Sequence, residues 1–326
     1  MGDVLVGLLA VVIGVIASYG LYWLLDRLLH LLPVKWQPKG QVWAFLLPAL
    51  VLLTLVLVVP LIVTVVWSFK SDNTKRWVGL ENYIDLFTSK DFLSILVNNF
   101  LWLAVVPAVV VFFGSVIAAL GNQVGPTREK VFKSLIFMPM AISFVAASTI
   151  WAYMYVFVPP GRPQIGLLNA IVTSLGFEPQ PWLTMDTGRL NTFLLMAVLV
   201  WLQVGYAMVI ISAAIKAVPQ ETVEAGLIDG AGGLQIFRKI VLPQVWSTIV
   251  AVFITILILV MKIFDIVLAM TGGNFNTSVL AFEYYEQFFV NSNTGPASAI
   301  VTVLCLLIAP LMWLQIRTVR HQQEIS

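Results

Sequence analysis

Residues 190–215 read LNTFLLMAVLVWLQVGYAMVIISAAI and contain no Asp, Glu, Lys or Arg. A helix of about 20 apolar residues is long enough to cross the hydrocarbon core of a bilayer. Such a segment must also satisfy its own backbone hydrogen bonds, and a helix does this within one stretch of chain. The stretch therefore predicts a helix that crosses a membrane.

Six other stretches have a similar length and hydropathy. They cover residues 4–25, 43–69, 100–121, 134–158, 245–270 and 297–316. The first lacks the basic start of a secretory signal, so we expect it to be retained. Pro139 lies inside the fourth stretch, but neighbouring helices in a membrane bundle satisfy the carbonyl groups that a proline leaves free. The sequence predicts an all-α, polytopic membrane helix bundle with about seven transmembrane helices.

The composition excludes several classes of protein. Apolar residues make up 60% of the chain and charged residues 10%, whereas about 25% of the residues in a soluble domain are charged. The formal net charge of +2 argues against nucleic-acid binding. With two histidines and no GxxxxGK(S/T) motif, we expect no metal site, no bound cofactor and no enzymatic activity in this chain. Transport is the function class that fits such a bundle.

Basic residues in the connections predict the orientation, because positively charged loops stay in the cytoplasm. One alternating set of connections holds Arg27, Lys35, Lys39, Arg128, Lys130, Lys133, Lys216, Arg238, Lys239, Arg317 and Arg320. The other set holds Lys70, Lys75, Arg76, Lys90, Arg162 and Arg189. Eleven basic residues against six predict that the N-terminus lies outside the cell and the C-terminus in the cytoplasm.

Two of the outer connections are long enough to hold structure of their own. Residues 159–189 are rich in Pro and Gly, which predicts an irregular segment around a short helix at 167–175. Residues 70–99 carry an apolar spacing that predicts short helices on the membrane interface. The spacing consists of Tyr83, Ile84 and Phe87, followed by Phe92, Ile95 and Leu96.

The connection at residues 216–243 is the longest inner loop and reads KAVPQETVEAGLIDGAGGLQIFRKIVLP. Pro219 suits the start of a helix, and the glycines at 230–233 suit its end. An apolar helical spacing then resumes and continues to Pro243. The residues alone leave two interpretations open: a solvated amphipathic linker, or a compact pair of helices beneath the membrane.

This loop resembles the EAA loop of bacterial ABC importer permeases. Glu224-Ala225-Gly226, then Gly230, then Ile240 and Leu242-Pro243 reproduce the spacing EAA-x3-G-x9-I-x-LP, with Gly226 where Ala is usual. In this family the loop couples the permease to an ATPase. The resemblance therefore implies a coupling role for Glu224, Ala225, Gly226, Asp229, Gly230, Ala231 and Phe237.

The resemblance extends over roughly residues 43–326. Val78-Gly79-Leu80-Glu81-Asn82-Tyr83 is similar to the first outer segment of sugar permeases, and Phe264-Asp265 with Thr271-Gly272-Gly273 is similar to their stretch after the loop. Residues 164–169 resemble the maltose, maltodextrin and α-glucoside branch. This implies a six-helix type I importer core at 43–326, with an extra transmembrane helix and a cytoplasmic connection at 1–42.

The resemblance also implies an assembly in a bacterial plasma membrane. This chain would form half of the path for a di- or oligosaccharide, beside a second, homologous permease. Two cytoplasmic ATPase subunits would bind ATP and Mg²⁺, and an extracytoplasmic binding protein would deliver the sugar. Leu227, Ile228 and Phe237 are expected to fix the coupling helix while Glu224 meets a basic residue of the ATPase.

Lys262 and Asp265 lie three residues apart in the sixth stretch, so we expect their side chains to meet on one helix face. A structural ion pair, hydrogen bonding to sugar and a proton relay all remain open. A relay would make the chain an ion-coupled secondary transporter, and a membrane scaffold is a third hypothesis. The segments that line the cavity in similar permeases contain Trp201, Gln203, Gly205, Tyr206, Val260, Ile263 and Phe264.

Overall fold

The computed structural model describes residues 2–29, 37–122 and 124–325. It divides into two compact units, Met1–Val66 and Trp67–Ser326. Within the described ranges the only β-type pairing is an isolated bridge between Lys70 and Trp77. The domain boundary at 42/43 stays a prediction, and residues 30–36 of the expected cytoplasmic connection lie outside the described ranges.

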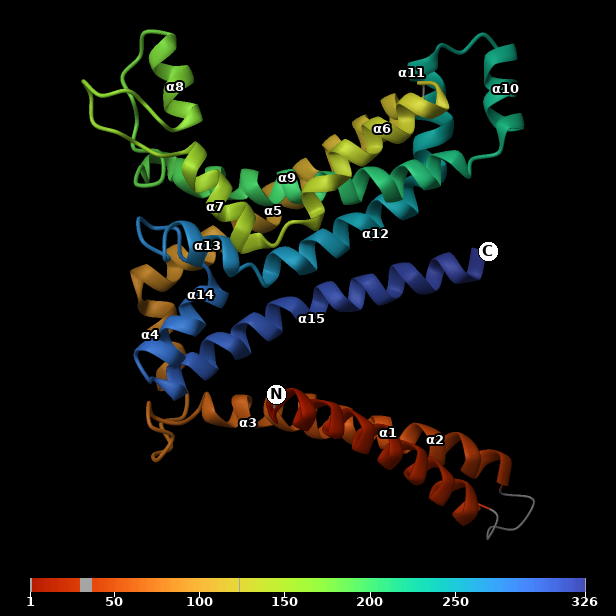
Figure 1. Cartoon of the computed structure of the whole chain (residues 1–326), viewed down its shortest axis with the longest axis vertical. Coiled ribbons are helices and arrows are strands. Elements are labelled where there is room, and N and C mark those ends of the chain that lie inside the picture. Colours follow the sequence, from red (N-terminus) through yellow and green to blue (C-terminus); the bar gives the residue numbers. More distant parts are fainter. Residues whose placement is uncertain (1, 30–36, 123, 326) are drawn as a thin grey trace. The chain divides into compact units, whose positions relative to one another are not determined.

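The first unit holds the two N-terminal spans. Its helices are α1 (Gly2–Leu29), α2 (Gln37–Leu53), the π-helix η1 (Thr54–Val58) and α3 (Val59–Trp67), which ends at the start of the second unit. α1 and α2 pack side by side (Figure 1), with Tyr22 stacked on Phe45 at 5.6 Å between ring centroids. Two stretches are long and apolar enough to span a membrane, Leu5–Arg27 and Gln41–Trp67. Their apolar side chains are largely exposed, as lipid-facing residues would be.

The second unit holds the remaining helices. They are α4 (Glu81–Thr88), α5 (Lys90–Gly121), α6 (Pro126–Phe137), η2 (Met138–Ala141), α7 (Phe144–Met154), α8 (Leu167–Ser174), η3 (Thr187–Arg189), α9 (Leu190–Lys216), α10 (Gln220–Ile228), α11 (Gly233–Ile236), η4 (Phe237–Val241), α12 (Leu242–Met261), α13 (Asp265–Met270), α14 (Leu280–Tyr285), η5 (Glu286–Val290) and α15 (Thr294–Ile325). Four stretches here are candidate spans: Lys90–Gly121, Thr187–Lys216, Gly233–Met261 and Thr294–Arg317.

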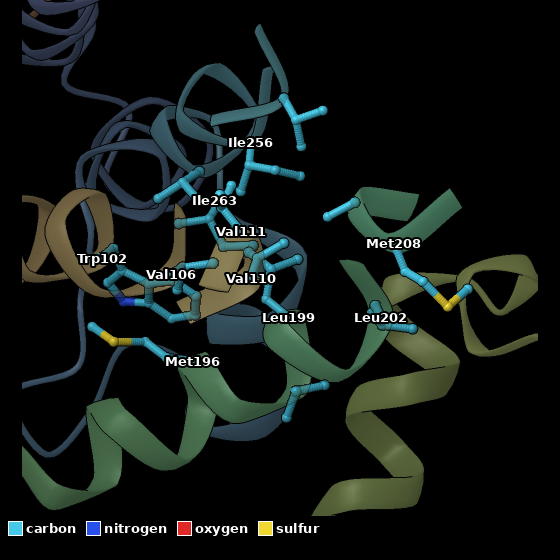
Figure 2. Packing of buried hydrophobic residues seen from close by; sticks show 14 of the residues in the cluster. Trp102, Val106, Val110, Val111, Met196, Leu199, Leu202, Met208, Ile256 and Ile263 are labelled. Atoms are coloured by element: carbon cyan, nitrogen blue, oxygen red, sulfur yellow. The ribbon is translucent and has the colours of Figure 1, made fainter. Parts of the chain in front are cut away.

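The core of the second unit lies where α5, α9 and α12 pack together. Figure 2 shows Trp102 and Val106 of α5 beside Met196 and Leu199 of α9, with Ile256 of α12 close by. All five side chains are at most 1% exposed. Since lipid tails are as apolar as these side chains, close packing rather than removal from water holds such helices together.

The expected fourth span is not one straight helix. α6 and η2 are followed by α7 at an angle of 101°. Pro139 supplies no backbone N–H to continue the first helix, and Ser143 starts the second by accepting a hydrogen bond from the backbone N of Ala146 at 3.2 Å. The described residues thus contain six candidate spans, or seven if the bent pair counts as one.

The third span begins earlier than its sequence predicted. A short helix is present at the first of the two expected positions as α4, and its location on the membrane interface stays a prediction, but Phe92 and Ile95 belong to the first turns of α5. Both side chains are nearly buried, at 3% and 6% exposed, against Leu280 and Ile300. The prediction of a second interfacial helix was wrong because this apolar stripe faces protein instead of the membrane surface.

Candidate functional site

The 216–243 loop folds into the expected pair of short helices. Pro219 precedes α10, which begins at Gln220. Gly230 ends the turn after α10 with a φ of +77°, a left-handed conformation that favours glycine. There the backbone N of Ala231 donates to the carbonyl of Gly226 at 2.9 Å. The loop is therefore a compact, hydrogen-bonded structure, consistent with the second of the two interpretations.

Gly226 is the position where α10 touches the following helix. It is buried, and a Cβ placed there would lie 2.6 Å from Cδ1 of Ile240 and 3.6 Å from Cγ1 of Ile236. Phe237 is half-buried against the core. The missing methyl group thus lets α10 lie close to η4. Because the nearest atom is the end of a flexible side chain, this departure from the usual motif is a small adjustment.

The other face of α10 is exposed. Leu227 and Ile228 are 57% and 86% exposed, so the expectation that they fix the helix was wrong. They follow Gly226 around the helix, which turns them away from Ile240. Glu224 and Asp229 are exposed on the same short segment, as is Ala225, whereas Ala231 is half-buried. Apolar side chains exposed beside carboxylates are typical of a surface that binds another protein.

Lys262 and Asp265 do not share a helix. α12 ends at Met261 with Lys262 as its C-cap, and α13 begins at Asp265 after Phe264 adopts an extended φ of −140°. Lys262 is exposed and Asp265 half-buried. Among the described residues no ion pair joins them. The expectation of one continuous helix was wrong because the α-helical hydrogen bonds stop at the end of α12. There the backbone N of Ile263 bonds to the carbonyl of Val260, three residues back instead of four.

The candidate path residues fall into two groups. Val260 and Ile263 are buried in the core, Gln203 is 5% exposed, and Gly205 is also buried. A Cβ on Gly205 would lie 2.4 Å from the carbonyl O of Ile136, so this glycine allows α9 to approach α6. Three aromatic candidates are half-buried and keep some free surface: Trp201, Tyr206 and Phe264.

The structure adds aromatic neighbours that the sequence did not indicate. Trp201 meets Trp151 of α7 edge to face, with ring centroids 5.9 Å apart. Phe264, at the break after α12, lies 5.2 Å from Tyr285 and 6.2 Å from Phe282, both on α14. Aromatic residues are abundant in all spans, so spacing alone could not single out these partners.

A polar cluster lies at the ends of α5 and α9 that are far from the 216–243 loop, and we call it the asparagine end. It consists of the buried amides Asn98, Asn99 and Asn191, together with Arg189 and the loop 271–280. Asn98 donates to two loop carbonyls at 2.8 Å and accepts a hydrogen bond from Arg189. Asn99 accepts from the backbone N of Leu280, and Asn191 donates to a third loop carbonyl. The three asparagines are at most 3% exposed. The loop that contains Thr271-Gly272-Gly273 is thereby fixed to α5 and α9.

The segment after α7 is organised by one residue, Asn169 of α8. Its side chain is fully buried, donates to the carbonyls of Val156 and Gln180, and accepts from the indole N–H of Trp182 at 2.8 Å. The expected helix at 167–175 is confirmed as α8. Asn169, the last residue of the 164–169 stretch, therefore holds the connection between α7 and α9 together.

Comparison with known proteins identifies relatives. Residues 110–321 match the model of the family described as binding-protein-dependent transport system inner membrane component. The chain is 48% identical over 281 residues to the alpha-glucoside transport system permease protein AglF of Rhizobium meliloti (strain 1021), covering 86% of this chain and 82% of that protein. It is 45% identical to the osmoprotective compounds uptake permease protein GgtC of Synechocystis sp., covering 86% and 99% of the two chains.

The fold is similar to that of a solved transporter. A chain from a bacterial ABC transporter involved in the import of the acidic polysaccharide alginate superposes with a TM-score of 0.75. The match covers 88% of this chain and 97% of that chain at 18% identity. The likeness therefore concerns the fold.

Proposed function

Because this chain belongs to the family of binding-protein-dependent transport system inner membrane components, we propose that it is the permease subunit that imports an α-glucoside-like di- or oligosaccharide. The 48% identity to an α-glucoside permease over most of both chains carries the proposal. Uptake of osmoprotective compounds is a second candidate function, supported by the 45% identity to a relative with that name.

The 216–243 loop is the proposed contact with a cytoplasmic ATPase that binds ATP and Mg²⁺. Leu227 and Ile228 supply exposed apolar area, and Glu224 and Asp229 supply charge for basic groups of the partner. Gly226 holds α10 against η4, so the helix moves together with the start of α12. A movement of the ATPase would reach the spans through this joint.

The sugar path is proposed to run past the half-buried aromatic residues. Trp201 and Phe264 present ring surface that suits the apolar face of a sugar. Phe264 lies at the break between α12 and α13, where the side chains of Lys262 and Asp265 can bond to hydroxyl groups. A second permease would supply the other half of the path, and an extracytoplasmic binding protein would deliver the sugar.

An ion-coupled secondary transporter has little support. That hypothesis needed Lys262 and Asp265 as a relay on one continuous helix, but Lys262 follows the end of α12 and Asp265 begins α13. The family match supports a subunit of a binding-protein-dependent transport system instead. Hydrolysis of ATP by a separate subunit is the proposed drive.

The orientation is a proposal with a direct test. Single cysteines from Gly2→Cys and Gln322→Cys, in a Cys305→Ala background, are labelled with an impermeant thiol reagent in intact and opened cells. If the bent pair α6–α7 crosses the membrane, seven spans put the two labels on opposite sides, with the N-terminus outside. Labels on the same side would show that the pair is re-entrant or that a span is missing.

Transport by the assembled complex tests the function. The chain is co-expressed with its neighbouring permease, ATPase and binding protein and reconstituted in liposomes. We expect ATP hydrolysis and uptake to be stimulated by α-glucosides such as maltose, sucrose or trehalose. Stimulation by a non-sugar osmoprotectant such as glycine betaine, without any response to sugars, would favour the second candidate. Uptake by this chain alone with an ion gradient would contradict both.

A further inference from the structure

A carboxylate lies near the end of α9 that leads into the 216–243 loop, which we call the coupling-loop end. This carboxylate holds two lysines from different helices. Glu129 of α6 forms an ion pair with Lys133 one turn further along and another with Lys216 at 2.5 Å. The side chains of Glu129 and Lys133 are 13% and 19% exposed, and that of Lys216 is 54% exposed. Glu129 therefore connects α6 to the last residue of α9 from a largely covered position.

The same cluster includes the end of α5. The ammonium group of Lys133 also donates to the hydroxyl of Ser212 on α9 and to the side-chain carbonyl of Asn122. Asn122 accepts a further hydrogen bond from Ser212 at 3.0 Å. Three helix ends thus meet at one charged cluster made of Asn122, Glu129, Lys133, Ser212 and Lys216.

This cluster lies at the base of the coupling loop. Lys216 is the last residue of α9, and only residues 217–219 separate it from α10. Further along, Gly205 brings α9 into backbone contact distance of Ile136 on α6. α6 is therefore held to α9 at two positions, and its far end leads into the 101° bend before α7.

We propose that Glu129 is a positioning residue that transmits movement of the coupling helix to the bent pair α6–α7. An ion pair of this kind often adds little net stability, since taking both charges out of water offsets their attraction. The contacts of such a pair can instead fix one arrangement of the helix ends. When the helices shift, the charged groups can form new contacts that fix a second arrangement, as salt bridges do at interfaces that change. Glu129 is placed for this because its carboxylate is shared between α6 and the start of the loop.

The inference rests on the proposed function, because it needs α10 to be moved by an ATPase. The experiment uses the complete complex in liposomes with its binding protein and measures ATP hydrolysed per sugar imported. Glu129→Gln keeps the shape but removes the charge. We expect this variant to keep its ATPase bound while the ratio rises about threefold or more, the size typical of coupling energies between sites.

Lys216 provides the matched variants. Lys216→Met should raise the ratio of ATP hydrolysed per sugar imported as Glu129→Gln does, whereas Lys216→Arg keeps the charge and should keep the wild-type ratio. The double variant Glu129→Gln with Lys216→Met should have a ratio no higher than either single variant. As a control, Lys130→Met removes an exposed lysine next to Glu129 on α6 and should leave the ratio unchanged. A merely structural cluster would lower yield or thermal stability without changing the ratio.

Two results are decisive. A wild-type ratio in both Glu129→Gln and Lys216→Met would overturn the inference. If Glu129→Gln fails to assemble, Lys216→Met decides alone, since its half-exposed side chain can be replaced with little effect on folding. Failure of the proposed function would look different, because the wild-type complex itself would then show no sugar-stimulated hydrolysis.

Discussion

The two ends of α5 and α9 differ in what surrounds their side chains. At the asparagine end, the side chains of Asn98, Asn99 and Asn191 are nearly fully buried and bonded to groups of this same chain. At the coupling-loop end, Leu227 and Ile228 are exposed apolar residues on α10. At the first end the asparagine side chains bond within the chain, and at the other end apolar side chains remain exposed, as the proposed contact with an ATPase requires.

We infer from this difference that the asparagine end acts as a rigid frame, whereas the proposed function requires the end at the 216–243 loop to move. Buried amides with all their partners rigidify a structure, because a lost hydrogen bond leaves a buried polar group unsatisfied. A short helix joined to its neighbours through Gly226 and a left-handed Gly230 can shift as a unit. Substitutions at the asparagine end should thus reduce stability, and those at the coupling-loop end should mainly reduce coupling.

The largest effect on stability is expected for Asn98→Leu. The change removes two bonds to loop carbonyls and leaves Arg189 without its acceptor on Asn98. At about 1–3 kcal/mol for each buried group left unsatisfied, we expect a loss of roughly 3 kcal/mol. Thermal unfolding of the purified complex measures it. Asn291→Ala, at an exposed position, is the control, and equal melting temperatures for the two variants would contradict the rigid-frame account.

A smaller and more selective effect is expected for two glycine-to-alanine changes. Gly205→Ala places a methyl group 2.4 Å from a backbone oxygen of α6, which must move, at a cost of about 1–3 kcal/mol. Gly226→Ala meets only the end of the Ile240 side chain, and we expect a change within about 0.5 kcal/mol. Melting temperatures of both variants test this order. The opposite order would show that α10, and not α9, is the tightly held helix.

The smallest effect concerns Glu283, a carboxylate on α14 outside the candidate spans. Burial raises the pKa of Glu283, the bond from Gln287 offsets part of this, and the Glu286 and Asp91 carboxylates add to the rise. An acid with a raised folded-state pKa costs no stability below its ordinary value of 4.5, and the cost grows as the pH rises through the folded-state pKa. Glu283→Gln should therefore slightly raise the melting temperature at pH 7. The gain should disappear near pH 4, and a gain that is independent of pH would contradict this cause.

Hydropathy located the spans well, but it could not say which prolines break a helix. Pro107 and Pro310 remain inside α5 and α15, whereas the chain turns sharply after Pro139. The local residues differ little. Ser143 caps the new helix after Pro139. Whether a proline bends a helix also depends on how the neighbouring helices pack, a tertiary property that one sequence does not display.

The conformation of the 216–243 loop was the most predictable part, because Pro219 and Gly230 act locally through their own backbone preferences. The exposure of Leu227 and Ile228 was not predictable, since it depends on which face of α10 meets Ile240. The ion pair between Glu129 and Lys216 was also missed. These residues are far apart in the sequence, and their meeting follows from the packing of α6 on α9.

In the proposed function, the 216–243 loop passes the effect of ATP hydrolysis to the spans. The most direct measurement is sugar-stimulated ATP hydrolysis, with co-purification of the ATPase, for complexes that carry Glu224→Lys or Gly230→Asp. Glu178→Lys, at an exposed position outside the loop, is the control. The account predicts inserted spans and an unchanged sugar affinity of the binding protein, with stimulation lost or the ATPase detached in both loop variants. Normal stimulation in both would contradict it.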